Sequence, residues 1–189
     1  MRKTMNKSLR VAAIAFSLAS MAGVSWAAKP VELDRGISPQ HPQQPQIAVD
    51  RQGAIHIVYG IANRARYRGS SDGGKTFSES VDLPTARAMS LGMRRGPRIA
   101  AMEKTLCVTL IGGEQGKGRD GDVLALRSVD GGKTWLGPIQ VNDVDDSARE
   151  GLHAMSTGPQ SELCCVWLDL RHGSTELRRT AHPMRLVTV

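Results

Sequence analysis

Five charged side chains with the chemistry to bind or cleave an anionic ligand lie in short segments that are rich in glycine, serine and proline. Three of them are arginines, Arg98, Arg149 and Arg171, and two are acidic, Glu150 and Asp169. A guanidinium group binds a carboxylate through two parallel hydrogen bonds, and a carboxylate beside it can transfer a proton. The arginines are therefore candidate substrate-binding residues, and Glu150 and Asp169 are candidate catalytic residues.

Each of these residues also has a structural interpretation, which stays open at this stage. Asp169 and Arg171 are two residues apart and can form an ion pair that only fixes their own loop. His153, at the expected start of a strand, is more typical of a hydrogen-bonded structural histidine. Glu114 and Asp120 belong to a glycine-rich segment and are expected to be solvent-exposed.

A sequence repeat organises the chain around these residues. The sequence Asp-Gly-Gly-Lys-Thr occurs twice between a serine and an aromatic residue, and the copies are 58 residues apart. Apolar triplets also recur, at Ile57-Val58-Tyr59, Val108-Thr109-Leu110 and Val166-Trp167-Leu168. The matching turn residues are Ser70, Asp72, Gly74, Thr76 and Phe77 in the first copy and Ser128, Asp130, Gly132, Thr134 and Trp135 in the second. A unit of about 50–58 residues therefore begins three times.

Each unit has the pattern of short strands and hairpins. Apolar or alternating runs are bounded by glycine, aspartate and proline, and no segment after residue 27 keeps apolar residues at helical spacing. Four strands in about 50 residues are typical of a propeller blade. The predicted fold is all-β, with about two and a half to three four-stranded blades of a β-propeller over residues 45–177. The third unit lacks its Asp-Gly-Gly hairpin, so we expect the chain to be truncated or out of frame after about Leu177.

The repeated turn itself is expected to be structural. Its aspartate can accept hydrogen bonds from backbone N–H groups, its glycines allow positive φ, and its hydroxyls bond locally. The aromatic residue is expected to pack between neighbouring sheets. Residues 69–76 also fit a phosphate-binding loop, but the second copy has Arg127 in place of the first glycine and neither copy begins a helix. One carboxylate per turn is too few for a calcium site.

The positions of the turns predict where a ligand would bind. In a four-stranded antiparallel blade, each turn lies at one of the two ends of the strands, which we call the two edges of the blade. The turn between the third and fourth strands lies at the same edge as the turn between the first and second. The repeated turns join third and fourth strands, so a ligand site built from several blades should use the opposite edge. The loops expected there are residues 91–98, 112–120, 147–153 and 169–172, which contain all five charged candidates.

The repeated turns resemble the Asp-boxes, or BNR repeats, of the sialidase (neuraminidase) superfamily. Phe77 in place of tryptophan is the one departure, and the resemblance covers about residues 44–177. It implies a six-bladed parent propeller with exo-sialidase-type glycoside hydrolase activity on glycans of the sialic-acid type. Arg98 is the closest match to the family's first-strand arginine motif, whereas Arg149 and Arg171 match no motif.

The resemblance does not assign the catalytic groups. Sialidases use a tyrosine nucleophile, and neither Tyr59 nor Tyr67, the two tyrosines of the chain, occupies its position. The chain supplies at most three of the six blades, so we expect it to be inactive alone. The alternative is a non-catalytic propeller that binds a glycan or a protein through its arginine-bearing face.

The first 27 residues have the pattern of an export signal. A basic segment is followed by an apolar run of about 14 residues and by Ser25-Trp26-Ala27. That run is shorter than the roughly 20 residues of a membrane span. We expect cleavage after Ala27 and a periplasmic or secreted protein, with a lead-in at residues 28–44 and an irregular tail at 178–189.

The composition further restricts the classes of partner and cofactor that we expect the protein to bind. The net charge is +7, but four of the 25 basic residues lie in the first 27, which leaves 21 against 18 acidic ones. No basic run or interleaved aromatics point to nucleic acid. Cys107, Cys164 and Cys165 have no metal-binding spacing, so no cofactor or metal is expected. Exposed blade edges make self-association the other expected interaction.

Overall fold

The computed structural model describes residues 29–36, 40–85, 88–158, 162–173 and 176–179 of the 189-residue chain. These residues form strands and no helix, which confirms the all-β prediction. No helix within these ranges could therefore cross a membrane. The predicted export signal lies outside the described residues. The strands are β1 (Gln43–Val49), β2 (Ile55–Ile61), β3 (Arg64–Ser70), β4 (Val81–Asp82), β5 (Ala88–Met89), β6 (Arg98–Met102), β7 (Thr105–Gly113), β8 (Asp122–Ser128), β9 (Leu136–Gln140), β10 (His153–Thr157), β11 (Leu163–Asp169) and β12 (Glu176–Arg179).

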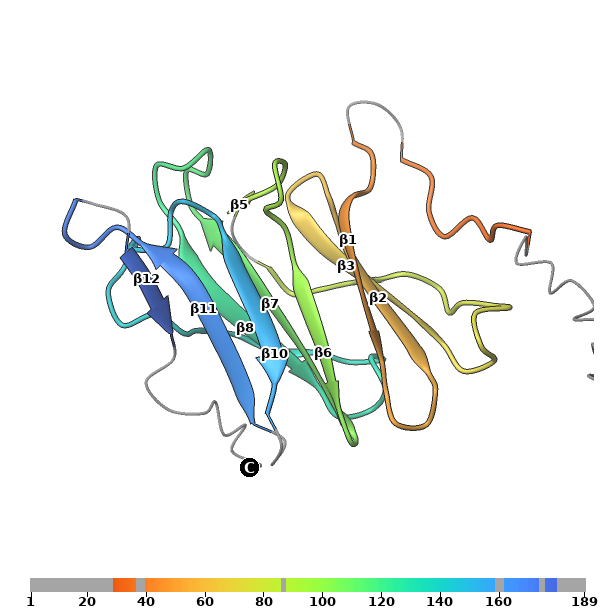
Figure 1. Ribbon diagram of the computed structural model, residues 1–189. Helices are drawn as coiled ribbons and strands as arrows, with labels where there is room; N and C mark the ends of the chain where they lie inside the picture. The colour runs from red at the N-terminus through yellow and green to blue at the C-terminus, as the bar shows by residue number, and fades with distance from the viewer. Residues whose placement is uncertain (1–28, 37–39, 86–87, 159–161, 174–175, 180–189) are drawn as a thin grey trace, which may run out of the picture. The chain divides into compact units, whose positions relative to one another are not determined.

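The strands form three antiparallel sheets in chain order (Figure 1). The first sheet is β1-β2-β3-β4. The second is built on β7, β8 and β9, with β6 and β5 pairing along the same edge of β7. The third sheet contains β10, β11 and β12, and β12 includes residues 178 and 179 of the expected tail. β6 contacts both β1 and β10, so the first strands of successive sheets are neighbours, as in a propeller.

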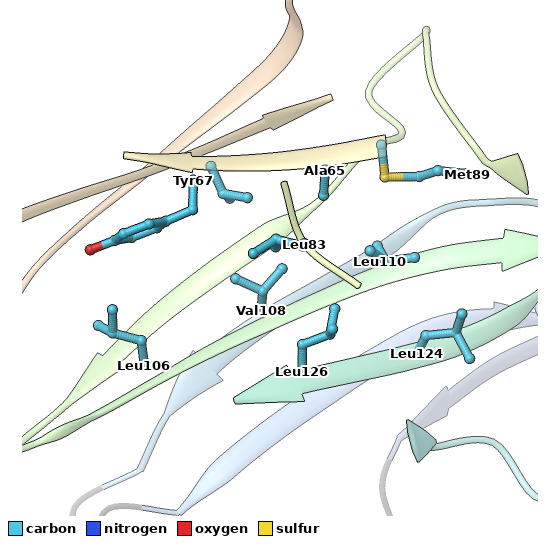
Figure 2. Close-up of a cluster of buried hydrophobic side chains, with 10 residues drawn as sticks. Ala65, Tyr67, Leu83, Met89, Leu106, Val108, Leu110, Leu124 and Leu126 are labelled. Carbon is cyan, nitrogen blue, oxygen red and sulfur yellow. The ribbon is translucent and has the colours of Figure 1, made fainter. Parts of the chain in front are cut away.

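Alternation of side chains gives every sheet two faces. On one face of the first sheet, Val58, Ala65 and Tyr67 point toward the second sheet and are almost completely buried. They pack against leucine and valine side chains of the second sheet, which Figure 2 shows across the gap: Leu106, Val108, Leu110, Leu124 and Leu126. This apolar contact joins the first two sheets.

The opposite face of the second sheet packs against the third. Two clusters fill this interface, one with Ile111, Val123, Ala148, Cys165 and Trp167, the other with Ala100, Met102, Cys107 and Leu163. Burial raises the pKa of both Cys107 and Cys165 to about 12. These two thiols are therefore uncharged at neutral pH and serve as small apolar side chains.

The third repeat is offset by one residue from the alignment that the sequence predicted. Val58 and Thr109 occupy matching positions, and each faces the sheet that follows its own. Trp167, aligned with them, faces the sheet that precedes its own. Because successive strand residues point to opposite faces, an offset of one exchanges the two faces. The alignment of Val166-Trp167-Leu168 with the earlier triplets is therefore wrong by one position.

The two repeated turns are held by the same hydrogen bonds. In the first, the Asp72 carboxylate accepts from the Thr76 N–H at 3.0 Å and from its hydroxyl at 2.6 Å. Asp130 and Thr134 form the same two bonds, at 3.0 and 2.6 Å. The threonine hydroxyl in each turn lowers the pKa of the aspartate, which is ionised at neutral pH.

Tyr67 ties the first sheet to the turn of the second. Its hydroxyl donates to the carbonyl of Gly131 at 3.0 Å and lies 2.8 Å from Nδ1 of His56. The ring meets Trp135 edge to face, with centroids 5.3 Å apart. It also passes so close to Gly132 that a Cβ there would lie 2.1 Å from the ring. The turn therefore packs against the neighbouring sheet, as expected for its aromatic residue.

Candidate functional site

A cavity of about 620 Å³ lies where loops of the first two sheets meet, at the edge opposite the repeated turns. Its walls come from the β2–β3 turn, the segment from β5 toward β6, and the β7–β8 loop. The described lining residues are Gln40, Gln43, Ala62, Asn63, Ala88, Met89, Ser90, Leu91, Arg95, Gln115, Gly116, Lys117 and Gly118. The cavity thus lies at the edge where turn parity predicted a ligand site.

The lining combines neutral amides with positive charge. Four carboxamides, from Gln40, Gln43, Asn63 and Gln115, can both donate and accept hydrogen bonds, and Arg95 and Lys117 contribute two cations. No aspartate or glutamate occurs among the described lining residues. Carboxamides match sugar hydroxyls, and the cations favour an anionic group. The walls described here can bind a ligand but contain no carboxylic acid for proton transfer.

The β7–β8 loop is shaped by a buried carboxylate. Asp120 accepts hydrogen bonds from the backbone N–H groups of Gln115, at 2.7 Å, and Gly116, at 2.8 Å. The Gln115 N–H group is the main reason that the pKa of Asp120 is lowered. The expectation that Asp120 is solvent-exposed was wrong, because its carboxylate folds back into its own loop. It thereby fixes the two residues that follow Glu114 on the cavity wall.

Two cavity residues other than glycine have left-handed backbone conformations. Ala62 has φ 52° and Lys117 has φ 56°. Such residues are uncommon, and each costs on the order of 1 kcal/mol of stability. Ala62 lies in the turn between β2 and β3 and Lys117 in the β7–β8 loop, so both conformations belong to turns that form part of the cavity wall.

Arg95 is held at the cavity by the loop that leads into β10, the first strand of the third sheet. Its Nε donates to the backbone carbonyl of Glu150 at 2.8 Å, and its Nη2 lies 3.9 Å from the Glu150 carboxylate. Within the described part of the chain, the Nη groups form no shorter hydrogen bond or ion pair, so they can contact a ligand. Glu150 is therefore the candidate catalytic residue that lies beside a residue of the cavity wall.

Arg98 does not line the cavity. Its Nη1 donates to the carbonyls of Gly96 and Pro97 at 3.1 and 3.0 Å, and its Nη2 donates to the carbonyl of Arg94 at 2.7 Å. Burial lowers the pKa of Arg98. The guanidinium closes the loop that presents Arg95, so its geometry accounts for a positioning role, and substrate binding by Arg98 stays a prediction.

Arg171 and Asp169 are engaged with each other, away from the cavity. Asp169 is completely buried and accepts from Nε of Arg171 at 2.9 Å, from Nε1 of Trp167 at 3.0 Å and from the hydroxyl of Ser147 at 3.0 Å. The hydrogen bond from Arg171 lowers the pKa of Asp169 and is the largest cause of that shift. Arg171 also donates to Asp143 at 2.6 Å. These contacts favour the ion-pair interpretation for both residues.

Arg149 and the two tyrosines also lie outside the cavity wall. Arg149 has one long hydrogen bond, 3.4 Å to the carbonyl of Asp146. The hydroxyl of Tyr59 donates to Asp34 at 2.6 Å, and that of Tyr67 is bonded to Gly131. The substrate-binding role of Arg149 stays a prediction, and the structure brings neither tyrosine to the lining described here.

A second cavity, of about 400 Å³, lies at the edge of the repeated turns. Its polar wall contains His56, whose Nε2 lies 3.2 Å from Asp50 while Nδ1 faces the hydroxyl of Tyr67. These groups satisfy one another, so they explain the structure of the turn without a ligand. Across the described ranges, no group of three His, Cys, Asp or Glu side chains is placed to hold a metal ion.

His153 is buried between the second and third sheets. Its Nε2 lies 3.1 Å from the hydroxyl of Thr109, and its Nδ1 has no hydrogen-bond partner in the described part of the chain. Burial, together with the nearby charge of Arg98, lowers the pKa of His153 to about 4. The histidine is therefore neutral at pH 7 and agrees with a structural interpretation.

Acidification should destabilise the protein through His153. The unfolded chain protonates this imidazole near pH 6.5, whereas the folded protein resists protonation until about pH 4. The unfolded state then binds more protons, so the free energy of unfolding should fall by about 2–3 kcal/mol as the pH falls through that window. Urea unfolding at pH 7.5 and pH 4.5 measures the fall. In His153→Gln the fall should be smaller by that amount, and equal falls would contradict the assignment.

Two solved structures share this fold over most of the chain. The α-L-arabinanase of Penicillium chrysogenum, complexed with arabinobiose, is 18% identical, with 76% of this chain and 46% of that chain covered and a TM-score of 0.52. The endo-arabinase of Bacteroides thetaiotaomicron is 12% identical, with 82% and 61% covered and a TM-score of 0.51. No family model and no curated protein matches the sequence.

These similarities show which fold the chain has and how much of a solved propeller structure it spans. Both structures are β-propeller glycoside hydrolases, which confirms a propeller-type, all-β arrangement. The chain spans about half the length of the first of them. Both are arabinanases rather than sialidases, so the comparison supports the propeller hydrolase fold and leaves sialidase membership as a proposal.

Proposed function

We propose that this chain contributes the glycan-binding part of a propeller protein of the glycoside hydrolase type, and that the cavity between its first two sheets binds an acidic sugar. The observation that carries the proposal is a wall with four carboxamides, two cations and no acidic residue in its described part. A sialic-acid-type ligand fits this wall, since its carboxylate can bind Arg95 or Lys117 and its hydroxyls can bind the amides.

For this chain alone, we propose that it binds a glycan and does not hydrolyse it. Glycoside hydrolysis ordinarily needs two carboxylates or, in sialidases, a tyrosine nucleophile. Glu150 is the acidic group nearest to Arg95, and no second one stands in the described wall. We therefore expect no cleavage of a fluorogenic sialoside. The proposal includes export to the periplasm or beyond, which the pattern of residues 1–27 supports.

Charge should decide which glycan binds. In ligand-observed NMR titrations, sialyllactose is expected to bind more tightly than lactose or arabinobiose, and added salt should weaken its binding. Arg95→Gln or Lys117→Gln should reduce the affinity for sialyllactose about tenfold, which corresponds to the loss of one charged contact. Lys133→Gln, which changes an exposed lysine on a repeated turn, is the matched control and should leave it unchanged.

The comparison of ligands separates the alternatives. If arabinobiose binds more tightly than sialyllactose and salt does not affect its binding, the cavity binds a neutral glycan and not an acidic one. Equal affinities of the wild type, Arg95→Gln and Lys117→Gln for every glycan would reject the cavity as the site.

A further inference from the structure

The loop that leads into β10, residues 147–152, packs against the cavity wall without lining the cavity. Gly151 is buried and contacts two lining residues, Arg95 and Ser90. A Cβ at position 151 would lie 2.8 Å from both Cδ and Nε of Arg95 and 3.1 Å from Cβ of Ser90. None of residues 147–152 is among the lining residues that the structure describes. The loop therefore contacts residues of the wall from outside the cavity.

Backbone hydrogen bonds fix this loop to two sheets. The N–H group of Ala148 donates to the carbonyl of Gly121, which directly precedes β8, at 3.0 Å. The N–H group of Leu170, which directly follows β11, donates to the carbonyl of Ser147 at 2.8 Å. The place of Gly151 is therefore set by the second and the third sheet together.

Of the two wall residues that Gly151 contacts, Arg95 is the one that can move. Ser90 is fixed, because its N–H group donates to the carbonyl of Ile111 in β7 at 2.8 Å. The Arg95 side chain is 28% exposed, and its Nε is held by the hydrogen bond to the carbonyl of Glu150. A methyl group added at position 151 should therefore displace the end of the arginine side chain and leave the backbone in place.

The hydrogen bond to Glu150 decides which donors Arg95 can offer to a ligand. Because Nε is occupied, the two Nη nitrogens remain as a planar pair of donors. Such a pair matches the two oxygens of a carboxylate, the group that makes a sialic-acid-type sugar acidic. A guanidinium that turned away from the Glu150 carbonyl would lose this orientation and keep only its charge.

We propose that Gly151 and the backbone carbonyl of Glu150 position the Arg95 guanidinium for the carboxylate of an acidic sugar. The third sequence repeat then takes part in ligand binding, although the cavity lies between the first two sheets. This inference rests on the proposed glycan-binding function, and it adds which loop prepares the cavity for an anionic group.

Gly173 is a matched control for Gly151. The two glycines have nearly the same backbone angle, φ 76° at Gly151 and 78° at Gly173. Each donates its N–H to the carbonyl three residues earlier, Gly151 to Ala148 at 2.9 Å and Gly173 to Leu170 at 3.0 Å. A Cβ at Gly173, however, would meet no atom within 4 Å. Gly151→Ala and Gly173→Ala should therefore carry similar backbone strain, and only the first should displace Arg95.

The NMR resonance of the Arg95 Nε–H group reports the displacement without any ligand. Arg95→Gln identifies this resonance by its disappearance from the spectrum of the isotopically labelled protein. Exchange of the Nε proton with water should be about tenfold faster in Gly151→Ala than in the wild type, which corresponds to the loss of one hydrogen bond. In Gly173→Ala the exchange rate should equal that of the wild type. Equal rates in Gly151→Ala and the wild type would overturn the proposal.

Titration with sialyllactose gives the functional readout. Gly151→Ala should bind it about tenfold more weakly than the wild type, and adding Arg95→Gln to this variant should weaken binding no further, because both act through one guanidinium. Gly173→Ala should bind as the wild type does. Arg95→Lys keeps the charge but not the planar pair of donors, so it should bind as weakly as Arg95→Gln.

The outcomes separate this inference from the proposed function. If the wild type binds sialyllactose and either Gly151→Ala or Arg95→Lys binds it equally well, the proposed function stands and the positioning of Arg95 is rejected. Arg95→Lys decides the matter if Gly151→Ala does not fold. If the wild type binds no sialyllactose, the proposed function is rejected, and the exchange rate of the Nε proton still shows whether Gly151 positions Arg95.

Discussion

Asp169→Ala is expected to lower the free energy of unfolding by about 3–5 kcal/mol, because it removes one partner of a buried ion pair. The carboxylate is completely buried and accepts hydrogen bonds from Arg171, Trp167 and Ser147. Its loss leaves the indole N–H of Trp167 and the Nε of Arg171 without their acceptor. Urea unfolding followed by tryptophan fluorescence should show the change as a lower midpoint with an unchanged slope.

Asp143→Ala is the matched control for this effect. Asp143 binds the same guanidinium at 2.6 Å, but its side chain is 75% exposed. Solvent screens such a pair, so its removal should cost far less than removal of Asp169. Equal stability of Asp169→Ala and the wild type would contradict the structural role and return Asp169 to the list of catalytic candidates.

Gly132→Ala is expected to destabilise the protein by about 3–4 kcal/mol, the sum of backbone strain and of overpacking. Gly132 has φ 88°, a conformation that alanine adopts only with strain. An added Cβ would also lie 2.1 Å from the ring of Tyr67. Tyr67 cannot retreat without breaking its hydrogen bond to Gly131 and its contact with Trp135. Thermal unfolding of the variant should show a correspondingly lower midpoint.

The neighbouring glycine separates the two causes. Gly131 has φ 73°, but a Cβ there would meet no atom within 4 Å. Gly131→Ala should therefore cost only the backbone strain, about 1–2 kcal/mol. If both substitutions cost the same, the close approach of Tyr67 contributes nothing.

The sequence predicted the local structure of the turns and strands well. The spacing of serine, aspartate, glycine and threonine is sufficient to specify a turn, since all its hydrogen bonds lie within five residues, as between Asp72 and Thr76. The chain order of strands and turns also placed two of the four candidate loops, residues 91–98 and 112–120, where the cavity lies. Both predictions depend on short-range patterns.

The side chains of the site were harder to predict. Residues 91–98 were chosen correctly as a cavity loop, but the sequence favoured Arg98, whereas the structure places Arg95 in the wall. The orientation of an arginine in a loop depends on which carbonyls its guanidinium meets, and those of Arg94 and Gly96 capture Arg98. The amides of Asn63 and Gln115 were missed because isolated carboxamides carry no motif.

The two remaining differences have separate causes. A short strand such as β11 aligns almost equally well in two registers when apolar residues occupy both of its faces. Packing between sheets, such as that of Trp167 with Ile111 and Val123, decides between them. The inward turn of Asp120 is local instead, since it binds N–H groups four and five residues away, but no motif in the glycine-rich segment marks it.

The order of the sheets along the chain bears on folding during synthesis. A chain that leaves the ribosome from its N-terminus completes its sheets one after another. The first sheet can already present Val58 and Tyr67 when the leucines of the second emerge, and the second in turn presents Ala100 and Met102 to the third. Each newly made sheet thus meets a finished apolar surface, so the protein can assemble vectorially from its N-terminus.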